Sequence, residues 1–132
     1  MAISYNEKAI LFTTKNWEAY ILQVKFSNKG SILIVGIIGE LDHHSAQYIR
    51  DKIDAEMIKA TTKNIIFDFS KVTFMDSSGI GVIMGRYKNI QKLNGKAVIV
   101  SVNSQIKRIF DMSGLFRIMP VYDNIDTAVK AI

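Results

Sequence analysis

The stretch FMDSSGIG, residues 74–81, places one acid, two neighbouring hydroxyls and two glycines directly after an apolar run. Such residues can supply a nucleophile, accept a phosphate, or cap a helix. A nucleophilic serine in a hydrolase elbow needs the pattern G-x-S-x-G, but here Asp76 directly precedes Ser77 and the glycines are residues 79 and 81. The phosphate-binding pattern G-x-x-x-x-G-K-[ST] is also absent from the sequence. The sequence therefore predicts no enzymatic activity.

The same stretch is compatible with a hydroxyl that accepts a phosphate at the N-cap of a helix. The residues from Gly79 onward have helical spacing, so free backbone N–H groups and the positive end of the helix dipole are expected nearby. A negative charge there is favourable by about 0.3–1 kcal/mol. Gly79 and Gly81 leave room for a partner's backbone, and each weakens the first helical turn by about 1 kcal/mol relative to alanine. From these residues alone, a simple cap and a docking surface are equally good interpretations.

Two further junctions combine polar side chains with the start or end of a helix. GELDHHS, residues 39–45, contains adjacent histidines that point in different directions, so capping by Asp42 or Ser45 with exposed histidines is favoured over a metal site. FDMSGLF, residues 110–116, is interpreted as a helix end followed by core residues. Asp68 is expected inside a strand, with no earlier acidic pair to hold magnesium, which argues against a response-regulator aspartate.

Alternating strands and helices position these junctions. The pattern predicts a hairpin of 20–26 and 31–38, further strands at 64–69, 96–102 and 117–122, and helices at 45–57, 79–92, 104–112 and 125–132. This order requires a mixed, largely parallel sheet with helices packed against it, which is an α/β fold. Residues 1–20 do not fit the scheme and are expected to form an N-terminal extension, in which AILFTT could add an edge strand or the chain could be a tail.

The composition limits the classes of function. The chain has 132 residues, a net charge of +5, 48% apolar residues and no cysteine. One domain of this size can bury its own core, and the lack of cysteine excludes disulfides and thiolate metal sites. The lysines are dispersed, which favours a solvated surface over nucleic-acid binding. No run is apolar enough to span a bilayer and the N-terminus lacks a signal-peptide pattern, so a soluble cytoplasmic protein is expected.

Three segments, GELDHHSA, FMDSSGIGVIMGRYKNI and IKRIFDMSGLFRI, together resemble the bacterial anti-sigma factor antagonists, which are small STAS domains. They are most similar to the sporulation members of that family, which release sigma-F, and the resemblance covers residues 21–132. It implies a STAS fold, with about five strands in a mixed, largely parallel sheet and about four helices packed against it. It also implies a binding protein with no catalysis and no cofactor of its own, acting as a monomer.

The resemblance further implies how such a site works. The partner would be an anti-sigma factor that is also an ATP-dependent serine kinase, and the unphosphorylated chain would bind it and so release the sigma factor. The serine that is phosphorylated in the family falls on Ser77, and a PP2C-type phosphatase would remove the phosphate. The partner-docking region falls on Asp42, His43, His44, Asp76, Ser77, Ser78, Gly79, Ile80 and Gly81.

Two alternatives remain open at this point. The chain could be a STAS domain of a stress-response pathway, with the same chemistry but a different kinase and sigma factor. It could instead sense a nucleotide or a lipid held at the junctions 39–45 and 76–81. The motif LDHHSA favours the sporulation members, and the sequence indicates a small, filled core rather than a ligand pocket.

Overall fold

The computed structural model describes residues 8–13, 21–59 and 61–132. The elements in chain order are β1 (Lys8–Thr13), β2 (Ile21–Lys29), β3 (Ile32–Leu41), α1 (Ala46–Lys59), β4 (Asn64–Met75), α2 (Ser77–Lys92), β5 (Ala97–Val100), α3 (Ser104–Ser113), the 3₁₀ turn η1 (Leu115–Arg117), β6 (Val121–Tyr122) and α4 (Ile125–Ala131). Within these ranges, no helix combines the length and apolar character needed to cross a bilayer.

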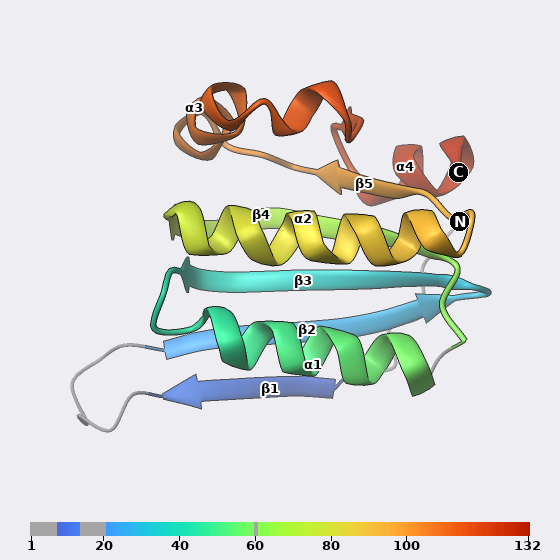
Figure 1. Cartoon of the computed structure of the whole chain (residues 1–132), viewed down its shortest axis with the longest axis horizontal. Coiled ribbons are helices and arrows are strands. Elements are labelled where there is room, and N and C mark those ends of the chain that lie inside the picture. Colours follow the sequence, from blue (N-terminus) through green and yellow to red (C-terminus); the bar gives the residue numbers. More distant parts are fainter. Residues whose placement is uncertain (1–7, 14–20, 60) are drawn as a thin grey trace.

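The described strands form one six-stranded sheet whose spatial order, β1-β2-β3-β4-β5-β6, follows the chain (Figure 1). The first two pairings are antiparallel and the last three are parallel. A parallel neighbour requires a crossover, which α1, α2 and α3 supply in turn. The predicted fold class is confirmed, and β1 is the edge strand suggested by AILFTT. The rest of the predicted extension, 1–7 and 14–20, lies outside the described residues.

The helices cover the two faces of the sheet unequally. On one face α1, α2 and α3 bury the main core, in which Ile49, Phe67 and Ile83 are inaccessible to solvent. On the other face the short helix α4 packs through Ala128 against β4, β5 and β6 (Figure 1). Because α4 has only seven residues, it leaves the part of this face over β2 and β3 less covered, and Lys25 is exposed there.

β4 continues past the predicted 64–69 to Met75, and its pairing with β3 is irregular at two places. Gly36 pairs with Asp68 but Ile38 pairs with Lys71, so β4 contains one extra residue between these pairs. A bulge of this kind reverses the alternation of faces along the strand, so residues 68 and 71 lie on the same face. The core agrees, since Phe69 and Val72 are both buried in it.

The strand predicted at 117–122 was too long. Residues 115–117 form a 3₁₀ turn, and only Val121–Tyr122 pairs with β5. This turn follows Gly114, which ends α3 in the left-handed conformation with φ 76°, as a serine-glycine helix end allows. Leu115 is fully buried directly after it, which confirms the predicted helix end at 110–116.

Candidate functional site

Asp76 is the N-cap of α2, and Ser77 is the first helical residue. The predictions that the helix begins at Gly79 and that a serine hydroxyl sits at the cap were therefore wrong. The backbone of Asp76 is extended, and its Oδ1 accepts hydrogen bonds from the backbone nitrogens of Ser78 at 2.9 Å and Gly79 at 3.4 Å. A carboxylate thus satisfies two of the free N–H groups of the first turn, at the end of the helix dipole that favours negative charge.

The second oxygen of Asp76 reaches the loop between β3 and α1. Oδ2 accepts a hydrogen bond from the backbone nitrogen of His43 at 3.2 Å and lies 3.7 Å from the Nδ1 atom of the same residue. The backbone nitrogen of Asp76 also donates to the carbonyl of Leu41 at 3.4 Å. The two junctions that the sequence marked separately, 39–45 and 74–81, are therefore joined through one side chain.

The protonation of Asp76 is determined by these contacts. Burial raises the pKa of the Asp76 carboxyl, but hydrogen bonds from the backbone of Ser78, His43 and Gly79, together with the charge of His43, outweigh burial and lower the pKa below its ordinary value of 3.8. Donors that bind the charged form of an acid favour ionisation. Asp76 is therefore a carboxylate at neutral pH.

The loop before α1 is organised by Asp42. Its Oδ1 accepts hydrogen bonds from the backbone nitrogens of His44 at 2.9 Å and Ser45 at 3.2 Å, and the buried Ser45 hydroxyl donates to the carbonyl of Glu40 at 3.1 Å. The side chains of His43 and His44 are 68% and 64% exposed, with their ring centroids 3.8 Å apart. Asp42 therefore closes the turn that precedes α1, which begins at Ala46, and both imidazoles are exposed to solvent, as predicted. The described residues contain no cluster of three metal-ligating side chains.

The two glycines of the first turn have different reasons to be glycine. A Cβ atom on the buried Gly79 would lie 2.5 Å from Cγ of Met75 and 2.7 Å from the carbonyl oxygen of Leu41. The close approach of α2 to the ends of β3 and β4 therefore requires Gly79. Gly81 is exposed, and a Cβ atom there would meet nothing within 4 Å. Gly81, but not Gly79, is available at the surface.

The two serines also differ in exposure. Ser77 is exposed at the first position of α2, whereas Ser78 is half-buried. Ile80 is half-buried and packs against the main core. Within the two junctions, 39–45 and 74–81, the exposed residues are therefore His43, His44, Phe74, Ser77 and Gly81, and the carboxylate of Asp76 is partly exposed.

The mixed sheet has the fold that the resemblance to STAS domains predicts. Asp76 caps α2 beside the β3–α1 loop within it. Residues 23–128 match the STAS domain family, and the chain belongs to that family. It is 43% identical over 103 residues to the anti-sigma F factor antagonist of Paenibacillus polymyxa, covering 78% of this chain and 88% of the relative. It is 31% identical over 87 residues to the anti-sigma-B factor antagonist of Bacillus subtilis, covering 66% and 78%. These relatives confirm the resemblance to the anti-sigma factor antagonists.

The solved structure of the anti-sigma factor antagonist SpoIIAA in its unphosphorylated form has a similar fold. The TM-score is 0.71 at 27% identity, over 83% of this chain and 97% of SpoIIAA. The phosphorylated form of SpoIIAA, described as a Bacillus cell fate determinant, matches with a TM-score of 0.65 at 27% identity, over 82% of this chain and 97% of that protein.

Proposed function

We propose that this protein is an anti-sigma factor antagonist that binds an anti-sigma factor with serine kinase activity while Ser77 is unphosphorylated. Binding releases the sigma factor from the anti-sigma factor, and phosphorylation of Ser77 abolishes this binding. The names of the relatives and the two known forms of SpoIIAA support this function. The observation that carries the choice of residue is the exposure of Ser77 at the start of α2, next to the half-buried Ser78. A PP2C-type phosphatase restores the binding form in the cytoplasm.

The proposed docking surface consists of the β3–α1 loop and the first turn of α2. The contact between Asp76 and the His43 backbone holds the two segments together, so a partner meets them as one rigid surface. Asp42, His43 and His44 contribute the loop side, and Ser77, Ser78, Ile80 and Gly81 contribute the helix side. Gly79 acts beneath this surface, by allowing α2 to approach β3 and β4.

Charge alone is sufficient for the switch. A phosphate on Ser77 adds about −1.5 to −2 charges at neutral pH. The helix N-terminus compensates by only about 0.3–1 kcal/mol, and Asp76 already occupies the Ser78 and Gly79 N–H groups. A partner carboxylate about 5 Å away would repel each unit of charge by roughly 3 kcal/mol at an effective dielectric constant near 20. Since about 1.4 kcal/mol is tenfold in affinity, the complex separates without refolding either protein.

Incubation with the cognate anti-sigma factor and ATP, followed by mass-spectrometric mapping of the phosphate, tests the proposal. The wild type and Ser78→Ala should each gain one phosphate, and Ser77→Ala should gain none. Phosphate on Ser78 in the wild type would contradict the choice of acceptor. Failure of the unphosphorylated chain to bind the anti-sigma factor would contradict the function itself.

The sigma-F pathway is the better assignment of the two that the relatives represent. Identity is higher to the anti-sigma F factor antagonist, at 43%, than to the anti-sigma-B factor antagonist, at 31%. Affinity capture with the purified chain, followed by identification of the bound kinase, separates the two pathways.

A further inference from the structure

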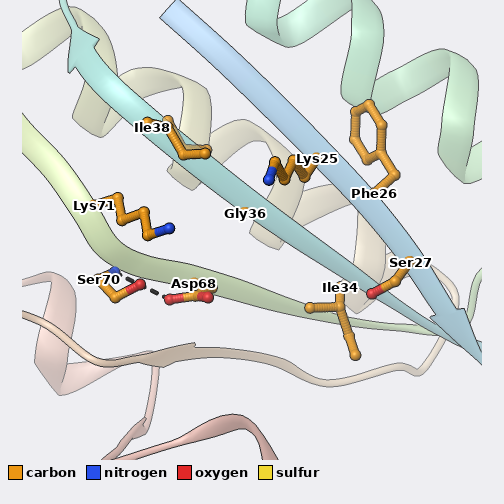
Figure 2. Close-up of a pocket in the computed structure, with 10 residues that line it drawn as sticks. Lys25, Phe26, Ser27, Ile34, Gly36, Ile38, Asp68, Ser70 and Lys71 are labelled. Atoms are coloured by element: carbon orange, nitrogen blue, oxygen red, sulfur yellow. Dashed lines mark hydrogen bonds between the residues drawn. The ribbon is translucent and has the colours of Figure 1, made fainter. Parts of the chain in front are cut away.

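A pocket of about 210 Å³ lies on the less covered face of the sheet, over β2, β3 and β4 (Figure 2). Its lining includes Lys25 and Ser27 from β2, Gly36 from β3, and Asp68 and Lys71 from β4. No residue of the proposed docking surface lines it. The pocket is therefore a separate feature of the fold, and its ability to hold a ligand does not depend on the proposed function.

Two cations converge over the middle of this pocket. Figure 2 shows the side chains of Lys25 and Lys71 reaching toward one another from the two sides of β3, with the bare backbone of Gly36 between them. Among the described residues, neither ammonium group makes a salt bridge. The two ammonium groups repel each other, and an anion between them would attract both and offset this repulsion. The arrangement thus has the charge of an anion-binding site.

The bulge in β4 creates this arrangement. Residues 68 and 71 would face opposite sides of a regular strand, but the extra residue in the pairing with β3 brings both to the pocket. The backbone nitrogen of Ser70, within the bulge, donates to Oδ1 of Asp68 at 3.0 Å, so the carboxylate stabilises the irregular backbone. Two ammonium groups and one carboxylate leave a net charge of +1, which matches a ligand with a single negative charge.

The walls of the pocket are partly apolar. Ser27 is only 1% exposed, and its Oγ has no hydrogen-bond partner. This oxygen is shielded from solvent, so Ser27 forms part of the wall beneath the pocket and does not contact a ligand. Ile34, which pairs with Ser27, is also buried, whereas the half-buried Ile38, on the other side of Gly36, provides aliphatic surface. A cavity of this size is smaller than the roughly 300–1,000 Å³ of pockets for drug-sized molecules, which indicates a small metabolite.

We propose that this pocket binds a small monocarboxylate with a short aliphatic body. The carboxylate lies between Lys25 and Lys71, and the body lies against Ile38, the residue of β3 that pairs with Lys71. This site differs in place from the junctions 39–45 and 76–81, where the sequence alone would put a ligand.

Titration of the ¹⁵N-labelled full chain, followed by amide chemical shifts, tests the proposal. The probes are sodium acetate, butyrate and hexanoate, with sodium chloride at the same ionic strength and sodium phosphate as controls. The carboxylates should cause saturable shifts at Gly36, Ser70 and Lys71, with tighter binding as the aliphatic chain lengthens. Chloride should cause none, and phosphate should bind more weakly than hexanoate because it lacks an apolar body.

Two variants localise the binding. Gly36→Ala places a methyl group in the pocket, only 3.8 Å from Cβ and the carbonyl oxygen of Lys25, an ordinary contact that the fold tolerates. Lys71→Gln removes one of the two cations. Each should weaken hexanoate binding by about tenfold or more, whereas Lys88→Gln, on the exposed side of α2, should leave it unchanged. Equal affinity for acetate and hexanoate, tighter binding of phosphate, or unchanged binding by both pocket variants would each overturn the proposal.

Discussion

The carboxylate of Asp76 accepts a hydrogen bond at 3.2 Å from the backbone nitrogen of His43, a residue 33 positions earlier in the chain. β3 and β4 are parallel neighbours, so the loops after them leave the sheet at the same edge. This edge is where α/β sheets commonly place their binding sites. One side chain that caps α2 and also holds the β3–α1 loop couples the stability of the domain to the shape of its proposed docking surface.

Asp76→Ala should lower the free energy of unfolding by about 1–2 kcal/mol, because the substitution removes the N-cap of α2. Urea unfolding followed by circular dichroism measures the change. Asp111→Ala, at an exposed position on α3, is the matched control and should change stability by less than about 0.5 kcal/mol. Equal stability of Asp76→Ala and the wild type would show that the cap and the loop contact contribute nothing to folding.

The lowered pKa of Asp76 predicts a stability that falls in acid. Between the folded and unfolded pKa values the unfolded chain binds more protons, so stability rises with pH there. The contribution of Asp76 is therefore fully present above the unfolded pKa of about 3.9 and is lost as the pH falls through the lower folded value. Unfolding free energies measured from neutral pH down to this range should depend less on pH in Asp76→Asn than in the wild type. Parallel curves for the two proteins would contradict the assignment.

Gly79 and Gly81 give a pair of opposite predictions within one helical turn. Gly79→Ala should destabilise the domain by about 1–3 kcal/mol, since its methyl group would overlap Met75 and the carbonyl of Leu41. Gly81→Ala meets open space and should stabilise the helix by about 0.5–1 kcal/mol. Thermal unfolding of both variants measures the difference. A stabilising Gly79→Ala would mean that α2 does not approach the strand ends as closely as the structure indicates.

The sequence predicted most of the fold because its signals are local. Alternating apolar residues and turn residues located the hairpin of β2 and β3, and helical spacing located α1, α2 and α3 within a few residues. The bulges in β4 were not predicted, because a bulge depends on the register with β3 rather than on the residues of β4 alone. The pocket around Lys25 and Lys71 was missed for the same reason.

The site was predicted in its parts but not in its connections. The motifs identified Asp42 and Asp76 as residues at helix starts, yet nothing in either motif indicates that Asp76 reaches His43. The two glycines read alike in the sequence, and only the packing of Met75 and Leu41 against Gly79 separates them. The contact between Asp76 and His43 and the difference between the two glycines both depend on segments far apart in the chain. Residue types and spacing alone could therefore not predict them.

The charge on residue 77 should control partner binding without altering the fold. Ser77→Asp places a single negative charge at an exposed position at the N-terminus of α2, where the helix dipole tolerates it, so its unfolding temperature should match that of the wild type. Its affinity for the anti-sigma factor should fall by about tenfold or more, since one charge opposite a partner carboxylate about 5 Å away costs roughly 3 kcal/mol before screening by salt.

Calorimetry with Ser77→Asp, Ser77→Ala and the wild type separates charge from the loss of the hydroxyl. Ser77→Ala should bind the anti-sigma factor as tightly as the wild type does. The loss of affinity in Ser77→Asp should become smaller at high salt, because ions screen exposed charges. If both variants bind equally weakly, the hydroxyl itself makes a contact that the partner needs, and charge repulsion is not the cause of the lower affinity. If Ser77→Asp binds as tightly as the wild type, residue 77 lies outside the interface, because a buried carboxylate at the centre of a docked surface could not leave the affinity unchanged.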